Sequence, residues 1–176
     1  MSGIIHPNDW AWIDSITGWM TEWECQWLAL MASTVCSWTE IGTFNGRSTM
    51  AVGLGLRKYS RLQLVDCCFG PLFKNNYKIL KQRRPDLNII RAECNSDYAA
   101  KYLYNTEVVF LDGDHYYPSI LNDIKIWRHK CVTLCGHDYD PVLEPGGHAG
   151  VVLAVDEYFG DNKDIVCDSI WWARNL

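Results

Sequence analysis

Apolar, strand-like runs alternate with helix-like segments along most of this chain. Five such runs end in acidic or polar residues, and they cover residues 34–42, 61–66, 87–93, 107–112 and 131–136. Strict alternation of strands and helices predicts βαβ units around a mainly parallel sheet. Right-handed crossovers then place helices on both faces of that sheet. We therefore expect a doubly wound α/β fold, with an antiparallel element from residues 164–174.

Helical patterns follow the strand-like runs. We expect helices over residues 47–59, 75–84, 96–104, 118–127 and 151–160. Pro85 ends the second of these, because proline disfavours helical backbone in the residue before it. The run at 107–112 is the most continuously apolar, so this strand should lie near the centre of the sheet.

The N-terminal residues 1–33 form a helical segment ahead of the core, and residues 1–176 fit one domain. Within this segment Trp19, Trp23 and Trp27 follow one another at four-residue spacing. Such a stripe is typical of packing against the sheet or a partner subunit. A hydrophobic lid over a substrate is the alternative, and the spacing leaves both open.

Composition excludes several classes of protein. A net charge of −5 gives no electrostatic reason for nucleic-acid binding. No apolar run approaches the roughly 20 residues that span a bilayer, and the N-terminus lacks the pattern of a secretory signal. We therefore expect a cytoplasmic protein without a membrane partner. Its eight cysteines include no C-x-x-C pair, so we interpret them as reduced, buried thiols.

Polar residues collect where the expected strands end, and ligands of parallel sheets bind beyond those carboxyl ends. Gly42 and Gly46 permit a tight turn before a helix whose free N–H groups favour an anion. Asp66, at the end of the second strand, is placed to accept hydrogen bonds from a ribose diol. Asn95 and Ser96 suit either contact with an adenine edge or capping of the next helix.

Five segments, spread over residues 34–160, together resemble one family. They are "TEIGTFNGRST", "LQLVD", "VVFLDGDHYYPSILNDIKIW", "CGHDYD" and "HAGVVLAVDEYF". In this order they are similar to class I S-adenosylmethionine-dependent methyltransferases, specifically the small-molecule O-methyltransferases. The resemblance implies a Rossmann-like sheet of seven strands, mostly parallel with an antiparallel C-terminal element.

The same resemblance assigns S-adenosylmethionine as cofactor. The methionine part of the cofactor would be held by Glu40, Gly42, Thr43, Phe44, Gly46 and Ser48. Asp66 would bind the ribose, Asn95 and Ser96 would border the adenine, and Asp112 would lie under the sulfonium and the amino group.

Metal-dependent relatives imply a site for Mg²⁺ or another divalent cation, with Asp112 and Asp138 as ligands. The catechol-type enzymes carry an asparagine where this chain has Tyr139, and His137 is the candidate replacement ligand. The catalytic lysine of those relatives corresponds to His115, which titrates near neutrality and is a candidate general base. Asp114 is the second candidate catalytic residue. A turn at Gly113 would let it converge with Asp112, and two like charges there would favour a bound cation.

The expected reaction is methyl transfer to a hydroxyl oxygen of a small molecule. The chain has no large inserted cap, so short loops or a second subunit in a homodimer must complete the substrate site. An NAD(P)-dependent oxidoreductase is one alternative, although the glycine spacing is G-x-x-x-G and not G-x-G-x-x-G. A non-catalytic nucleoside-binding protein of the same fold is another, because fold alone does not establish chemistry.

Overall fold

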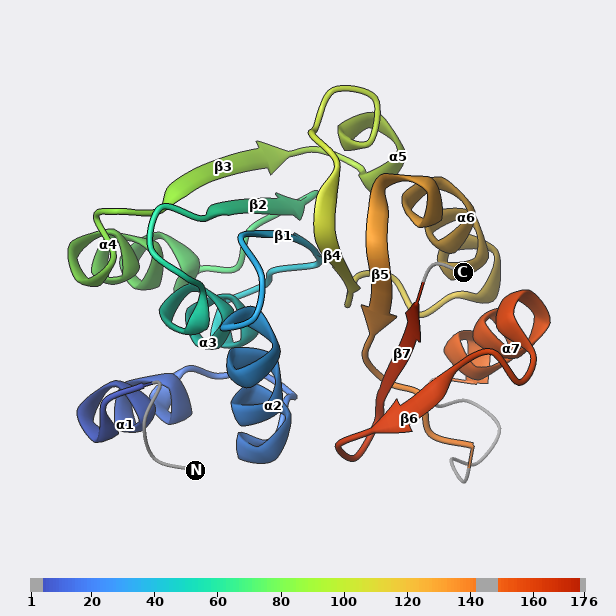
Figure 1. The fold of residues 1–176 in the computed structure, drawn as a ribbon, viewed down its shortest axis with the longest axis horizontal. Coiled ribbons are helices and arrows are strands. Elements are labelled where there is room, and N and C mark those ends of the chain that lie inside the picture. The colour runs from blue at the N-terminus through green and yellow to red at the C-terminus, as the bar shows by residue number, and fades with distance from the viewer. Residues whose placement is uncertain (1–4, 142–148, 175–176) are drawn as a thin grey trace.

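A seven-stranded mixed sheet organises the protein, in a computed structural model that describes residues 5–141 and 149–174. The strand order is β3-β2-β1-β4-β5-β7-β6 (Figure 1). The strands are β1 (Ser37–Ile41), β2 (Arg61–Asp66), β3 (Asn88–Glu93), β4 (Thr106–Leu111), β5 (Cys131–Gly136), β6 (Asp164–Val166) and β7 (Ile170–Arg174). Strands β1 to β5 are parallel, and β7 runs antiparallel to β5 and β6. The predicted sheet is confirmed, including the central place of β4 and its pairing with β5.

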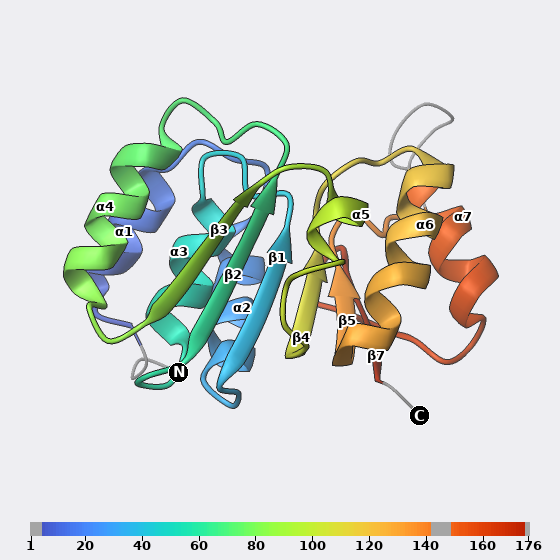
Figure 2. The same ribbon diagram turned by 90° about the horizontal axis from the view of Figure 1, so that it is seen from above.

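Helices cover both faces of this sheet (Figure 2). One face carries α1 (Pro7–Ser15), α2 (Glu22–Ala32), α3 (Arg47–Gly55) and α4 (Phe73–Arg83). The other carries α5 (Ser96–Ala99), α6 (Tyr117–Trp127) and α7 (Ala149–Phe159), and the 3₁₀ turn η1 (Arg128–Lys130) leads into β5. Across the described residues, no helix is long and apolar enough to cross a membrane.

Strand β4 shows why a sheet covered on both sides needs a continuously apolar sequence. Val108 and Phe110 face the core under α1 to α4, whereas Val109 and Leu111 face the core under α6 and α7. All four are at most 2% exposed. Burial of each such side chain contributes roughly 1.5–3 kcal/mol, so this strand anchors both cores.

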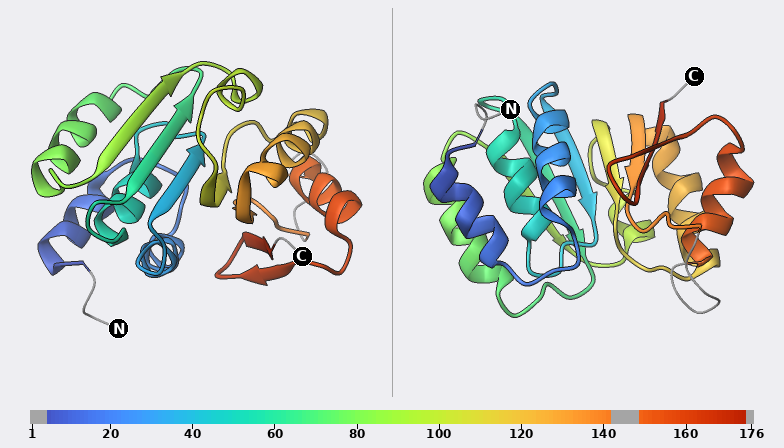
Figure 3. Two further views of the ribbon diagram at one scale, coloured as in Figure 1. Left: turned by 45° about the horizontal axis from the view of Figure 1, so that its top comes forward. Right: turned by 90° about the horizontal axis from the view of Figure 1, so that it is seen from below.

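The β6–β7 hairpin closes the sheet beyond β5 (Figure 3). Trp171 and Trp172 of β7 alternate between the two cores, as neighbouring residues of a strand do. The C-terminal segment therefore forms two short antiparallel strands, which confirms the antiparallel element expected from residues 164–174.

The helix expected over residues 96–104 is wrong in length, because α5 ends at Ala99. The side-chain amide of Gln63 holds the backbone of Tyr104 under the sheet: Nε2 donates to the carbonyl oxygen at 2.9 Å, and Oε1 accepts from the N–H at 3.0 Å. Gln63 is fully buried, so these bonds replace water and favour a looped connection over a longer helix.

The tryptophan stripe divides between two environments. Trp27 packs edge-on against Trp172 with ring centroids 5.1 Å apart, as the packing interpretation expects. Trp19 lies ahead of α2 and is 81% exposed, and Trp23 is 70% exposed. Packing therefore accounts for only one of the three residues.

The cysteines are less uniform than expected. All eight are free, but only Cys25, Cys131 and Cys135 are buried. Cys36, Cys67 and Cys68 are exposed because they lie beside the starts and ends of strands and not within them.

The chain makes a close crossing at Gly42, directly after β1. Gly42 has φ +85°, and a Cβ atom there would lie 1.9 Å from the carbonyl oxygen of Asp112. On either side of this point the N–H of Asp112 donates to Ile41, and the N–H of Gly42 donates to Val65. Only glycine fits, because it tolerates positive φ and has no side chain to collide with the neighbouring strand end.

We expect Gly42→Ala to destabilise the protein more than Gly160→Ala. Both positions have positive φ, which costs an alanine about 1–2 kcal/mol, but a Cβ at Gly160 has nothing within 4 Å. The clash at Gly42 adds about 1–3 kcal/mol. Urea unfolding of the two variants measures the difference, and equal losses would contradict the close crossing.

Candidate active site

A cavity of about 970 Å³ opens at the carboxyl ends of the parallel strands. Its wall comes from the loop before α2 and from the segments that follow β1, β2, β3, β4 and β5. Between β1 and β4 the strand order reverses, and open α/β sheets bind ligands at such switch points. The cavity therefore lies beyond the carboxyl ends of the parallel strands, where the sequence predicted a ligand site.

Asp66 holds the loop between β1 and α3. Its Oδ2 accepts the backbone N–H groups of Thr43 and Phe44, each at 2.8 Å, and its Oδ1 accepts that of Cys68 at 2.9 Å. A carboxylate offers about four acceptor sites, so most of its capacity serves the backbone. Asp66 lines the cavity as predicted, but its first role in this structure is to shape the loop beside it.

Glu40 lies beneath the cavity and not on its wall. It is fully buried, and its oxygens accept the hydroxyl groups of Ser48 (Oγ) and Thr49 (Oγ1), the latter at 2.7 Å. Burial raises the pKa of Glu40 to about 8 and outweighs the two hydroxyl bonds, which act to lower this pKa; Asp112 and Asp66 add smaller contributions in the same direction as burial. Ser48 lines the cavity, so contact between Glu40 and a ligand would run through this hydroxyl.

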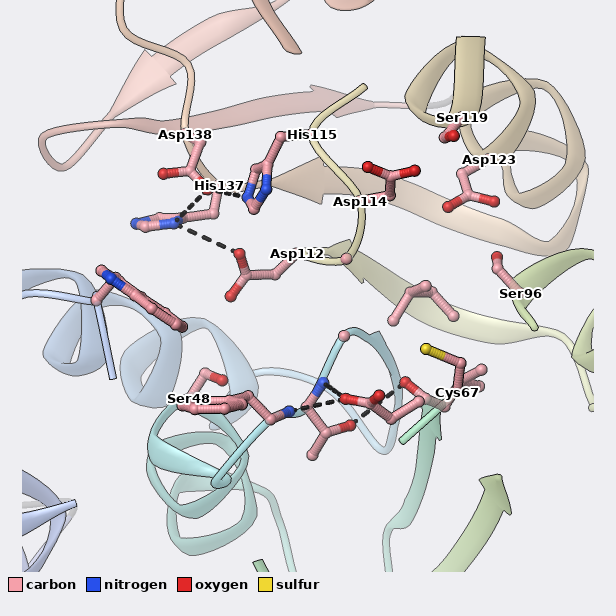
Figure 4. Close-up of a pocket in the computed structure, with 18 of the residues that line it drawn as sticks. Ser48, Cys67, Ser96, Asp112, Asp114, His115, Ser119, Asp123, His137 and Asp138 are labelled. Carbon is pink, nitrogen blue, oxygen red and sulfur yellow. Dashed lines mark hydrogen bonds and ion pairs between the residues drawn. The ribbon is translucent and has the colours of Figure 1, made fainter. Parts of the chain in front are cut away.

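His137 is the centre of a buried charged cluster (Figure 4). Its Nε2 lies 3.0 Å from Oε1 of Glu24, and its Nδ1 lies 3.2 Å from Asp138 and 3.5 Å from Asp112. Burial alone would lower the pKa of His137, but the three carboxylates raise it to about 12. Both ring nitrogens of His137 thus face carboxylate oxygens, and the described residues whose ligand atoms converge are Asp112, His115 and Asp138.

The pKa values of the three carboxylates around His137 are shifted in different directions. Burial acts to raise the pKa of Glu24, but bonds from His137, Thr21 and Ser169 lower it to about 2. The pKa of Asp138 is also lowered, because its bonds to His115 and His137 outweigh burial. Burial raises the pKa of Asp112. The hydrogen bond and the charge of His137 act to lower this pKa but offset the effect of burial only in part.

His115 joins the cluster from the cavity side. Its Nε2 lies 2.7 Å from Oδ2 of Asp138, and this bond raises the pKa of His115. Ligand atoms of Asp112, His115 and Asp138 all lie within 4.8 Å of one another. The predicted convergence of Asp112 and Asp138 is therefore present, and the nitrogen next to them that could serve a cation belongs to His115.

Asp114 turns away from Asp112, contrary to the expected convergence. Its carboxylate accepts the N–H of Tyr116 at 3.0 Å and the hydroxyl of Ser119, which together lower the pKa of Asp114. It therefore caps the turn before α6, although it still lines the cavity.

The remaining predicted residues border the cavity in different ways. Asn95 and Ser96 both line it, and the Asn95 side chain makes no capping bond to α5. Gly46 starts α3 with φ +86°. Trp19 and Phe44 contact each other at the wall, with ring centroids 5.1 Å apart and planes tilted by 37°, so the exposed tryptophan belongs to the cavity and not to a packing stripe.

The sequence did not indicate two residues of the candidate site, Glu24 and Asp123. Glu24 lies on α2, and its only signal was the capping-box spacing with Thr21, which indicates a helix start and not a site. Asp123 lines the cavity from α6. Its signal was a carboxylate among the buried apolar residues of a helix.

We expect stability to fall as pH rises from about 4.5 to 8, through Glu40. The folded protein keeps this proton over that window while the unfolded chain releases it, so the slope is at most about 1.4 kcal/mol per pH unit. Glu40→Gln retains hydrogen bonding to Ser48 and Thr49 without the titration. Urea unfolding at pH 5 and pH 8 should show a smaller loss for this variant, and identical losses would mean that Glu40 is ionised in the folded protein.

Solved structures share this fold at low sequence identity. An O-methyltransferase from Bacillus cereus, in complex with S-adenosylhomocysteine, is 10% identical with a TM-score of 0.68, over 98% of this chain and 93% of that one. The O-methyltransferase TomG from Streptomyces achromogenes, which is involved in tomaymycin synthesis and was solved with S-adenosylmethionine, is 12% identical with a TM-score of 0.68, over 98% and 92%. A Podospora anserina methyltransferase with bound S-adenosylhomocysteine is 12% identical with a TM-score of 0.68, over 99% and 91%.

No curated protein sequence matches the chain. The family model of the methyltransferase domain matches residues 39–139, from β1 to the residue after Asp138. This stretch contains the glycine loop, Asp66 and the cluster around Asp112. It covers more than half of the 176 residues, and the protein therefore belongs to the methyltransferase domain family.

Proposed function

We propose that the protein transfers a methyl group from S-adenosylmethionine to a hydroxyl oxygen of a small molecule. The observation that carries this proposal is one cavity, lined both by the glycine loop with Asp66 and by the Asp112–His115–Asp138 group. A cofactor held at the loop then presents its methyl group to an acceptor beside two carboxylates and an imidazole. O-methyltransferases with the same fold support the choice of oxygen as acceptor.

The reaction is an in-line displacement in which the acceptor oxygen forms a bond to the methyl carbon as the sulfur–carbon bond breaks. S-adenosylhomocysteine leaves, and the hydroxyl proton must pass to a base. His115 is that base in our proposal, because it is partly exposed at the cavity and its partner Asp138 stabilises the imidazolium that forms. The rest of the site contributes alignment, which is the larger part of such catalysis.

The residues fit a divalent cation. Asp112, His115 and Asp138 supply two carboxylates and one imidazole at mutually compatible distances, and they would be its ligands. Because His115 would then be a ligand, the cation would take over its role as base by lowering the pKa of the acceptor hydroxyl. His137 then keeps the two carboxylates oriented from behind, as partners of metal ligands commonly do.

We expect S-adenosylhomocysteine to bind the purified protein, measured by isothermal titration calorimetry. Asp66→Ala should weaken this binding about 10- to 100-fold, because it releases the loop N–H groups of Thr43 and Phe44 and removes an acceptor for the ribose. Lys58→Ala, in the turn before β2, is the control and should bind as the parent does. Thermal protection by NADH without protection by S-adenosylhomocysteine would replace this function with oxidoreduction.

We expect saturable binding of Mn²⁺, followed by its electron paramagnetic resonance signal. Asp138→Asn should weaken it at least about tenfold, because one charged ligand is lost. Asp114→Asn is the matched control, since its carboxylate faces the start of α6 and not the cluster. A parent protein that binds no Mn²⁺ would remove the cation from the proposal and leave His115 as the base.

A further inference from the structure

The cavity extends well beyond the charged cluster, to an end formed by α6 and the start of α5 (Figure 4). Ser119 and Asp123 line this end from α6, where their four-residue spacing puts them on one helical face. Ser96 faces them from the first residue of α5. The carboxylate of Asp123 is thus held at the opposite end from Asp138, on a rigid helix.

Burial of the Asp123 carboxylate costs free energy of folding that its contacts within the protein do not offset. The residue is 8% exposed and sits among Ile120, Ile124 and Trp127, all buried on the same helix. Burial raises the pKa of Asp123 to about 6, and the nearby charges of Asp114 and Asp97 add to this. An apolar side chain at this position would avoid these costs, so folding gives no reason for a carboxylate here.

The hydrogen bonds of Asp123 are also incomplete. Its partner is the hydroxyl of Ser96, which accepts the indole N–H of Trp127 at 2.7 Å and therefore directs its own proton to Asp123. Within residues 5–141 and 149–173, no lysine, arginine or histidine forms an ion pair with this carboxylate. Most of its roughly four acceptor sites therefore remain for a ligand that donates hydrogen bonds.

A metal ion does not suit this end of the cavity. The acids at this end are Asp97, Asp114 and Asp123. The carboxylate of Asp114 already accepts the hydroxyl of Ser119 and the N–H of Tyr116. In the described part of the chain, the acidic and histidine side chains close enough to share an ion are those of Asp112, His115 and Asp138. The hydrogen-bond donor that suits the remaining acceptor sites of Asp123 is therefore an N–H or O–H group of an organic ligand.

The proposed cofactor has such a group at the required end. Methyl transfer would place the sulfonium beside Asp112 and His115, and Asp66 lines the same cavity from the end of β2, next to β3, the strand that leads to Ser96. The adenine then extends towards α6. Its exocyclic 6-amino group only donates, whereas its ring nitrogens accept.

We propose that Asp123 accepts a hydrogen bond from the 6-amino group of the cofactor's adenine and thereby selects adenine over a 6-oxo purine. The proposal rests on the proposed function and assigns the base-recognition residue within it. Asp123 is a specificity-determining residue here, because it contacts the base and not the reacting atoms. A purine with a carbonyl oxygen at this position would place one acceptor against another, and a buried site rejects such a pairing strongly.

Titration calorimetry with S-adenosylhomocysteine and its 6-oxo analogue S-inosylhomocysteine tests this inference. The parent protein should prefer the adenine compound about 10- to 100-fold, the range of one hydrogen bond to a charged group. Asp123→Asn should abolish most of this preference, because an amide can donate to the 6-oxo group. The variant should fold, since it is isosteric and removes a buried charge. Asp161→Asn, in an exposed turn, should keep the full preference.

The outcomes separate this inference from the function on which it rests. Tight binding of S-adenosylhomocysteine by the parent, with an unchanged preference in Asp123→Asn, would overturn the role of Asp123 and leave the proposed function intact. Failure of the parent to bind S-adenosylhomocysteine would overturn both.

Discussion

One buried imidazolium, that of His137, holds the active end of this protein together. A charge away from water is tolerated only when it is paired and hydrogen-bonded. Here the partners are Glu24 from α2, Asp112 after β4 and Asp138 after β5. The backbone N–H of His137 also donates to Leu111 at 3.1 Å. Removing Glu24 would take away the carboxylate that faces Nε2 of His137 in the interior, so the strand ends and α2 depend on one another.

This dependence explains how a chain without an inserted cap gains a further wall for its cavity. Glu24 uses Oε2 to cap its own helix through the N–H of Thr21, and Oε1 to bind His137 and the Ser169 hydroxyl. Docking α2 in this way brings the preceding loop, with Trp19 and Met20, onto the cavity wall. The N-terminal segment is therefore part of the site and not only a support for the sheet.

Carboxyl groups near the strand ends serve different purposes because their surroundings differ. Glu40 is enclosed by hydroxyl groups and has a raised pKa. Asp66 accepts three backbone N–H groups and shapes the loop that faces the cofactor in our proposal. Asp123 has one hydroxyl partner and a free approach from the cavity. Hydrogen-bond supply, more than position along the sheet, decides which carboxylate is available to a ligand.

Much of the architecture was predictable from local patterns. Alternating apolar and helical periods predicted the parallel strands, the central β4 and the pairing that joins the ends of β4 and β5. The length of α5 was not predictable, because the buried amide of Gln63 from another strand overrides the helical pattern after Ser96. Nor was the exposure of Trp19, which depends on where α2 begins.

The sequence by itself determined that Asp112, His115 and Asp138 would lie at the carboxyl ends of the strands, because each residue follows closely after a strand-like apolar run. Only the tertiary structure decided their partners. Glu24 lies 113 residues before His137, and no local pattern records that contact. Whether a histidine becomes an imidazolium, a base or a ligand is set by the carboxylates that distant segments bring to each ring nitrogen, and long-range packing alone positions them.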